Sequence, residues 1–156
     1  MHLKYLVDED FTNYKKCSMF IGTSSCTFKC EKECGIQCCQ NSPLVKVQTK
    51  FIDDEVIIQR YLKNPFTKAI VIGGLEPFDT YDELLTFCRL FRQSSPDTIV
   101  IYTGWYPDEI TAEVTEITQL NNIVIKYGRY IPKSEPIFDK TLGVTLASSN
   151  QFAVAY

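Results

Sequence analysis

Short runs of apolar, β-branched residues alternate with amphipathic segments along most of the chain. This alternation predicts a mostly parallel sheet with right-handed crossovers and helices on its outer face, an α/β fold. The predicted strands span residues 17–23, 68–72, 98–103 and 122–127. The predicted helices span residues 53–64 and 81–93, and a third begins near Pro107 and carries Ile110, Val114 and Ile117 on one face.

Capping residues and apolar stripes mark the first two helices. Asp53 is a candidate N-cap, and Thr80 with Glu83 three residues later forms a predicted capping box. The residues predicted to lie on the buried faces are Ile57, Ile58, Tyr61 and Leu62 in one helix and Tyr81, Leu84, Leu85, Cys88 and Phe91 in the other.

Loops that follow parallel strands meet at one edge of a sheet, where ligands commonly bind. Three loops with unusual residues follow predicted strands: residues 24–44, residues 73–77 and residues 103–104. We therefore expect these three loops to come together in the fold. The last 25 residues are less regular: residues 142–146 and 152–156 favour strands, but the polar residues 148–151 interrupt them.

Charge and composition exclude several classes of protein. The net charge is −3, with 45% hydrophobic and 22% charged residues, so nucleic acid is not an expected partner. Acidic residues near the N-terminus interrupt the apolar stretch that a signal peptide needs, and no apolar run approaches the ~20 residues of a membrane span. We expect a cytoplasmic protein without a membrane anchor, whose partner is a protein or a small ligand.

The loop at residues 24–44 holds five of the seven cysteines: Cys26, Cys30, Cys34, Cys38 and Cys39. In a reducing compartment, such a cluster favours metal or redox chemistry over structural disulfides. A structural zinc site usually needs two separated ligand pairs, and the chain offers no second pair and only one histidine, His2. An iron-sulfur cluster bound by thiolates from one loop is the favoured interpretation.

The spacing of the cysteines leaves one ligand open. Cys26 and Cys30 form a C-x3-C pair, and the third ligand could be Cys34, Cys38 or Cys39. Cys17 and Cys88 lie in a predicted strand and on a predicted buried helix face, and we expect both to pack in the core.

Four segments, in order, resemble the radical S-adenosylmethionine superfamily, and within it the activating proteins of anaerobic ribonucleoside-triphosphate reductases. The likeness covers nearly the full chain. Its segments are the cysteine loop ending in Cys39-Gln40-Asn41, the turn Gly73-Gly74-Leu75-Glu76-Pro77, the stretch Tyr102-Thr103-Gly104-Trp105, and the tail elements Gly128-Arg129-Tyr130-Ile131 and Ser148-Ser149-Asn150-Gln151. Departures from the family pattern are the inserted Leu75 and Tyr127 in place of the usual Asp.

The resemblance implies a fold and a set of cluster ligands. Residues 1–156 would form a single domain with a partial (β/α) barrel of the radical SAM type and a cluster loop at residues 24–44. The family has C-x3-C-x2-C followed one residue later by Asn, so Cys26, Cys30 and Cys39 would bind a 4Fe-4S cluster, with six extra residues between the second and third ligands. Cys38 and then Cys34 are the next candidates for the third ligand.

The resemblance also implies an activity. S-adenosylmethionine would bind the iron that lacks a cysteine, and its reductive cleavage would give a 5′-deoxyadenosyl radical. Gly73, Gly74 and Glu76 would contact the methionine end of this cofactor, and Thr103 and Gly104 the nucleoside. No catalytic residue beyond the cluster is implied.

The partners implied by the resemblance are two proteins. One is a glycyl radical enzyme, such as anaerobic ribonucleotide reductase, on which the radical would be generated. The other is a reduced electron donor of the flavodoxin or ferredoxin type.

A non-catalytic alternative has a closed cluster. In an iron-sulfur binding or electron-transfer module, Cys34 or Cys38 would supply a fourth thiolate. Two charged residues also have simpler interpretations. Glu76 could favour the positive end of the next helix, and for Arg129 an ion pair with an exposed acid is favoured over contact with a substrate carboxylate.

Overall fold

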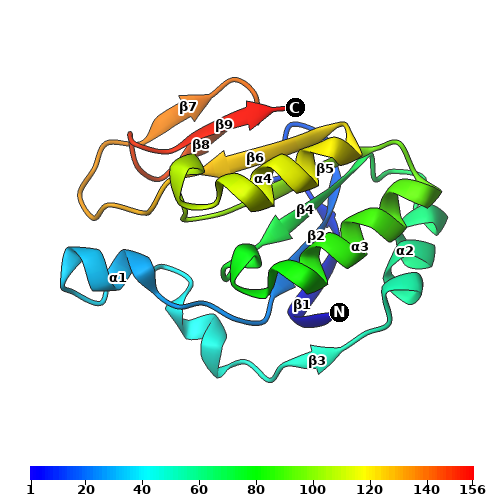
Figure 1. Cartoon of the computed structure of the whole chain (residues 1–156), viewed down its shortest axis with the longest axis horizontal. Helices are drawn as coiled ribbons and strands as arrows, with labels where there is room; N and C mark the ends of the chain where they lie inside the picture. Colours follow the sequence, from blue (N-terminus) through cyan, green and yellow to red (C-terminus); the bar gives the residue numbers. More distant parts are fainter.

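The computed structural model describes residues 1–156 and has a seven-stranded mixed sheet at its centre (Figure 1). The strand order is β3-β1-β2-β4-β5-β6-β9, and a separate hairpin is made by β7 and β8. The strands are β1 (His2–Asp10), β2 (Ser18–Thr23), β3 (Lys50–Phe51), β4 (Ala69–Gly73), β5 (Thr98–Tyr102), β6 (Ile123–Tyr127), β7 (Ile137–Asp139), β8 (Val144–Leu146) and β9 (Phe152–Ala155).

The four predicted strands form the parallel centre of the sheet. β2, β4, β5 and β6 pair in parallel and in sequence order, which confirms the mostly parallel arrangement expected from the alternation of strands and helices. On one side β1 pairs antiparallel with β2 and β3 with β1, and on the other side β9 pairs antiparallel with β6.

The predicted partial (β/α) barrel of the radical SAM type is wrong. The sheet is open, with β3 at one edge and β9 at the other, and the antiparallel strands end the parallel repeat on both sides. Each βαβ unit takes about 30 residues. A full six-unit barrel would therefore need a longer chain than these 156 residues.

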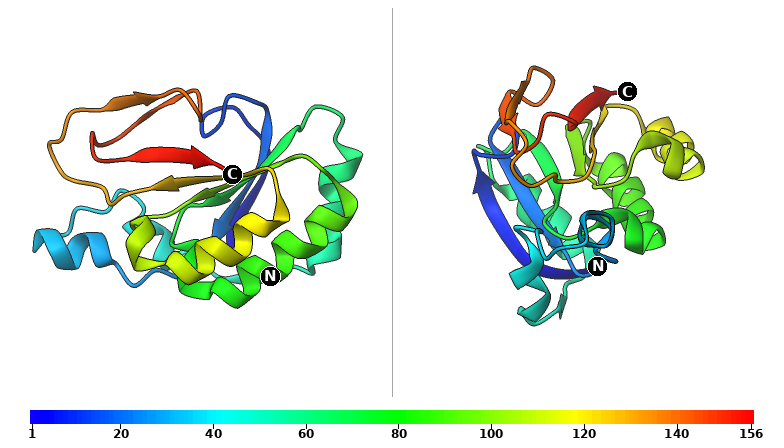
Figure 2. Two further views of the ribbon diagram at one scale, coloured as in Figure 1. Left: turned by 45° about the horizontal axis from the view of Figure 1, so that its top comes forward. Right: turned by 90° about the vertical axis from the view of Figure 1, so that its left-hand side faces the viewer.

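Three helices cover one face of the sheet, and a fourth lies apart from them. α2 (Asp54–Lys63), α3 (Tyr81–Ser94) and α4 (Thr111–Ile117) form the covering layer, and the right-hand view of Figure 2 shows α3 and α4 on one side of the strands. α1 (Lys29–Cys34) lies at one end of the molecule in Figure 1. None of the helices combines the length and the apolar character that a membrane span requires. Four short 3-10 helices complete the fold: η1 (Ser42–Lys46), η2 (Pro77–Thr80), η3 (Pro107–Glu109) and η4 (Thr118–Leu120).

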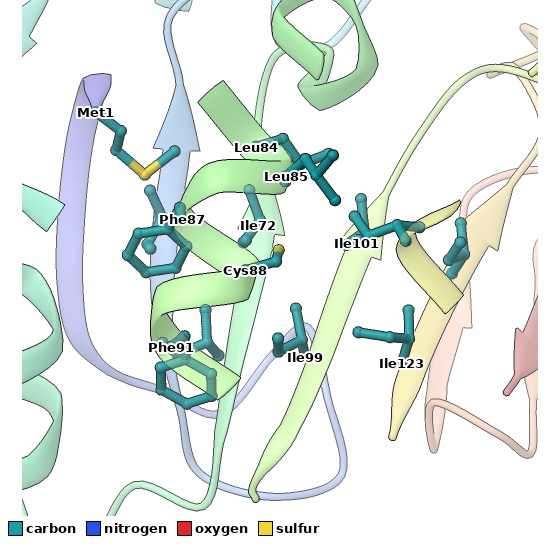
Figure 3. Close-up of a cluster of buried hydrophobic side chains, with 14 of the residues drawn as sticks. Met1, Ile72, Leu84, Leu85, Phe87, Cys88, Phe91, Ile99, Ile101 and Ile123 are labelled. Carbon is teal, nitrogen blue, oxygen red and sulfur yellow. The ribbon is translucent and has the colours of Figure 1, made fainter. Parts of the chain in front are cut away.

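The main core lies between the sheet and the covering helices (Figure 3). Isoleucines of β4, β5 and β6 face Leu84, Phe87 and Phe91 of α3, and Cys88 is fully buried among them. This burial confirms that Cys88 packs as a small apolar residue. Cys17, in contrast, is only half-buried, directly before β2.

A smaller apolar cluster lies on the opposite face of the sheet. Phe20, Val71 and Val100 point to this side, where Leu142 and Leu146 from the β7–β8 region pack against them. The hairpin covers only part of this face. The carboxyl ends of the parallel strands border the cavity described below.

Some local predictions are confirmed and others differ from the structure. β1 was not predicted, because its acidic residues alternate only weakly with apolar ones. Asp53 caps α2 by accepting a hydrogen bond from the Glu55 N–H, as predicted. Thr80, however, does not cap α3, because it ends the 3-10 turn η2 and its hydroxyl donates to the Pro77 carbonyl. Leu62 is exposed on α2.

Candidate functional site

An open cavity of about 370 Å³ lies where the central parallel strands end. The strands end level with one another, since Gly22 of β2 pairs with Gly73 of β4 and Tyr102 of β5 pairs with Lys126 of β6. The three loops predicted to meet therefore do so. Their residues that line the cavity include Cys26, Cys30, Cys39, Gly74, Leu75, Glu76, Thr103 and Gly104.

The cavity separates the five loop cysteines into two groups. Cys26, Cys30 and Cys39 line it and are half-buried, and these are the three residues predicted as cluster ligands. Cys34 and Cys38 do not line it. Their sulfur atoms lie 2.9 Å from each other, with Cys34 exposed to solvent.

Hydrogen bonds fix the start and the end of the cysteine loop. The N–H of Glu76 donates to the Ser25 carbonyl at 2.8 Å, which ties the loop to the turn after β4. Beyond Cys26 the chain turns into α1 through Phe28, whose φ of 54° is left-handed. The carboxylate of Glu31 in α1 then accepts a hydrogen bond from the Cys39 N–H at 3.1 Å. One end of the loop is thus held by the turn after β4 and the other end by α1.

An ion-pair network anchors α1, which has no buried residue of its own. Glu109 accepts hydrogen bonds from the Arg129 guanidinium at 2.5 and 2.7 Å and also pairs with Lys29 of α1. Glu33 lies 3.0 Å from Nε of Arg129 as a charge contact without hydrogen-bond geometry. The Lys29 ammonium lies 4.1 Å from the centre of the Trp105 ring.

Arg129 pairs with an acid, as the sequence favoured, but the pair is not on the surface. Arg129 is only 4% exposed. Its hydrogen bonds, followed by that of Lys29, lower the pKa of Glu109 to about 2 against the opposing effect of partial burial. The network therefore holds α1 through one buried guanidinium, whose charged partners Lys29, Glu33 and Glu109 remain partly exposed.

Burial disfavours the charged form of each thiol that lines the cavity. It raises the pKa of Cys26 to about 12, against the hydrogen bond from the Phe28 N–H, and it also raises the pKa of Cys30 and of Cys39. Metal binding needs thiolates, so loading of this site must release protons to the solvent.

Glu76 links two of the loops at the cavity. One carboxylate oxygen accepts a hydrogen bond from the Thr103 hydroxyl at 2.7 Å and another from the Phe78 N–H at 3.2 Å, and the second oxygen accepts from the Gly104 N–H at 2.8 Å. Burial nevertheless raises its pKa to about 7, because these hydrogen bonds only partly offset the loss of water. Glu76 also caps η2, so the interpretation as a helix-capping acid holds in addition to its place at the cavity.

The two glycines before Glu76 have different roles. Gly73 does not line the cavity; a β-carbon there would lie 2.9 Å from Cβ of Tyr102, so glycine allows β4 and β5 to approach. Gly74 lines the cavity with a φ of 84°, and glycine adopts this left-handed conformation at least cost.

Lys126 is a cavity residue that sequence reasoning missed. It is 7% exposed, and its ammonium donates to the Gly128 carbonyl at 2.9 Å. Burial lowers its pKa to about 8, although Glu76 and Cys30 act in the opposite direction. The available signal was a single lysine within an otherwise apolar central strand, because a cation in such a place needs a partner.

The two tail elements of the resemblance contact each other. The Ser148 hydroxyl accepts from the Ile131 N–H at 2.9 Å, and the Asn150 side chain donates to the Arg129 carbonyl at 2.8 Å. Gln151 lines the cavity and donates to the Gly128 carbonyl at 3.2 Å. The polar interruption before β9 thus supports the segment that follows β6.

The donor set fits a 4Fe-4S cluster better than a single metal ion. No three Cys, His, Asp or Glu side chains converge on one ion-sized point. The three thiols instead line one cavity of about 370 Å³, as ligands to different corners of one cluster would. No other cysteine lines the cavity.

Comparison with known proteins identifies the same chemistry. Neither the curated proteins nor the solved structures contain a significant match. The family model described as "4Fe-4S single cluster domain" matches residues 15–152, which include all the cavity residues named above. The chain therefore belongs to the 4Fe-4S single cluster domain family.

Proposed function

We propose that the protein is a radical S-adenosylmethionine enzyme that generates a glycyl radical on a partner protein. The observation that carries this proposal is the lining of the cavity by three, and only three, of the loop cysteines. A cluster of four irons bound by three thiolates keeps one iron without a protein ligand. That iron would face the cavity, where a small molecule has room to bind.

Cys26, Cys30 and Cys39 would hold the cluster. When bound, a reduced 4Fe-4S cluster supplies one electron, which cleaves S-adenosylmethionine into methionine and a 5′-deoxyadenosyl radical. The protein's own contribution is to hold this cofactor beside the cluster and to exclude water from it.

Glu76 would bind the ammonium group of S-adenosylmethionine. Its carboxylate has about four acceptor positions, and the protein uses three of them. The positions of both oxygens are fixed by donors from the loop after β5, so an incoming ammonium meets an oriented acceptor. The buried environment strengthens such a charged hydrogen bond.

Lys126 would bind the carboxylate of the same cofactor. Its ammonium has three donors, and the protein accepts one hydrogen bond from it, at the Gly128 carbonyl. A buried cation with unused donors beside a cavity is suited to an anionic ligand group. Glu76 and Lys126 together present opposite charges to a zwitterionic ligand.

The partners follow from the same proposal. A reduced flavodoxin or ferredoxin would supply the electron, and a glycyl radical enzyme such as anaerobic ribonucleotide reductase would donate hydrogen from a glycine α-carbon. The open side of the cavity and the exposed α1 lie at the same edge of the sheet, which is where such a partner would dock.

The alternative is an electron-transfer module with a closed cluster. It needs a fourth thiolate, and the candidates are Cys34 and Cys38. Both lie outside the cavity wall and contact each other. The open site is therefore the better supported of the two.

Cleavage of S-adenosylmethionine tests the proposal directly. The protein is reconstituted anaerobically with iron and sulfide, reduced, and assayed for 5′-deoxyadenosine, and we expect the product only with reductant present. The paramagnetic resonance spectrum of the reduced cluster should also change when the cofactor is added. Full iron and sulfide loading with neither product nor spectral change would reject the radical enzyme and favour the closed cluster.

A further inference from the structure

Two cysteines in the insertion of the cluster loop have no place in the proposed site. Cys34 is the last residue of α1, which ends at Gly35 with a left-handed φ of 69°. The chain then reverses so that the sulfur of Cys38 lies 2.9 Å from that of Cys34. Apart from this contact, the Cys34 thiol meets only the carbonyls of Glu31 and Ile36, and neither cysteine lies in an apolar core.

We propose that Cys34 and Cys38 are a redox-active thiol pair that forms a reversible disulfide with each other. Their sulfur separation is roughly 1 Å more than the ~2.0 Å of a disulfide bond. The segment between them can close this gap, because α1 has no buried residue and Gly35 has no neighbouring atoms where a β-carbon would be. The exposure of Cys34 gives an external oxidant access to the pair.

The oxidant would be a low-molecular-weight disulfide, such as oxidised glutathione. The Cys34 thiolate attacks one sulfur of the oxidant, a mixed disulfide forms, and one thiol leaves as the oxidant's S–S bond breaks. Cys38 then attacks the Cys34 sulfur and displaces the second thiol. The protein loses two protons and two electrons, and the oxidant gains both the electrons and the protons and is released as two thiols.

The pair is distinct from the three residues that line the cavity, although Cys38 is joined by one peptide bond to Cys39. A disulfide here constrains the backbone beside Cys39 without using its thiol. The proposal therefore assigns Cys34 and Cys38 to thiol-disulfide exchange, and it requires no cluster in the cavity.

Peptide mapping of the full chain tests the assignment. Anaerobically purified, metal-free protein is equilibrated with mixtures of reduced and oxidised glutathione, quenched with N-ethylmaleimide and digested. We expect one intramolecular disulfide, between Cys34 and Cys38, that disappears on treatment with excess dithiol. C34S and C38S should each abolish it, and C38S should accumulate a glutathione adduct on Cys34. C17S, which changes a cysteine outside the loop, should leave it unchanged.

The same alkylation of cluster-loaded protein separates this proposal from the cluster assignment. Cys34 and Cys38 should react with N-ethylmaleimide while Cys26 and Cys30 are protected. Protection of Cys34 or Cys38 would make that residue a cluster ligand and overturn the redox pair. A disulfide between Cys38 and Cys39, or no disulfide over the whole range of glutathione mixtures, would also overturn it. None of these results depends on whether S-adenosylmethionine is cleaved.

Discussion

Cys39 lies nine residues after Cys30 in the sequence, yet it lines the same cavity as Cys26 and Cys30. We therefore predict that C39A loses the cluster. Removal of one of three thiolates leaves too few protein ligands to hold four irons. The expected result is near-complete loss of bound iron and sulfide after anaerobic reconstitution, measured against the wild-type protein.

Two matched substitutions control for general effects of removing a thiol. C38A changes the neighbouring residue outside the cavity wall and should keep full iron and sulfide content. C88A should also keep the cluster, but it should lower the free energy of unfolding by roughly 1 to 2 kcal/mol, because Cys88 is fully buried in the core. Loss of the cluster in C38A with retention in C39A would reverse the ligand assignment.

Glu76 should make the stability of the metal-free protein depend on pH. Burial raises its pKa from 4.5 to about 7 in the folded state. The folded state therefore holds a proton that the unfolded state releases, and the free energy of unfolding should fall as pH rises from about 4.5 to 7, by on the order of 3 kcal/mol. Glu109 titrates below this window and Lys126 above it.

Urea denaturation at a series of pH values measures this slope. E76Q cannot ionise and should flatten it, whereas E135Q, at an exposed position, should keep it. An unchanged slope in E76Q would mean that other groups cause the pH dependence.

At the residue scale, the sequence predicted which thiols line the cavity better than it predicted the charged residues around them. Cys26, Cys30 and Glu76 could be found because they follow strands, and strand ends share an edge. Lys126 could not be found in this way because it lies within a strand rather than after one. The spacing of the cysteines could not decide between Cys38 and Cys39, because their orientation depends on how α1 and its C-terminal turn redirect the chain.

At the element scale, α1 depends on charge rather than on apolar burial. Glu109 is the centre of its anchoring network, and its removal would leave Arg129 buried without its main partner. We predict that E109A lowers the free energy of unfolding by about 3 kcal/mol. It should also accelerate amide hydrogen exchange in residues 29–34, because Lys29 loses its ion pair as well.

The exposed pair between Arg60 and Asp8 provides the control. Both side chains are well exposed, so D8A should cost less than about 1 kcal/mol and leave exchange in α1 unchanged. If E109A and D8A had equal effects on unfolding, the network would be no stronger than a surface ion pair.

Elements with a strong pattern were predictable, and those decided by tertiary contacts were not. The strands β4, β5 and β6 are short apolar runs that turn residues end clearly. β1 became a strand through pairing with β2 and through the stacking of Tyr5 on Phe20. Residues 45–52 contain the end of the 3-10 helix η1 and only the two-residue strand β3.

At the scale of the whole molecule, alternation determines the parallel centre of a sheet but not its closure. Four parallel strands with helices on one face are common to open sheets and barrels. The choice depends on what pairs with the edge strands, and here β1 and β9 pair antiparallel with β2 and β6. Nothing in the periodicity of residues 2–10 or 152–155 shows the direction in which they pair, so the barrel was predicted wrongly.

The cavity at the ends of the parallel strands leads to a prediction for the whole fold. S-adenosylmethionine that binds in the cavity should stabilise the cluster-loaded protein, by about 2.7 kcal/mol at a concentration 100-fold above its Kd. Thermal unfolding under anaerobic conditions, with and without the cofactor, measures this shift. Absence of a shift in the wild-type protein would contradict binding in the cavity.

Lys126 provides the sharpest variant for this measurement. K126M keeps an unbranched side chain of similar length in the strand and removes a buried charge, so the cofactor-free protein should be no less stable. The cofactor-induced shift should be largely lost, because the cofactor carboxylate then lacks its cation. K140M removes an exposed lysine between β7 and β8, away from the cavity wall. The cofactor should stabilise this variant as much as it stabilises the wild type. If the cofactor raised the unfolding temperature of K126M as much as that of the wild type, the buried ammonium would not bind the cofactor carboxylate.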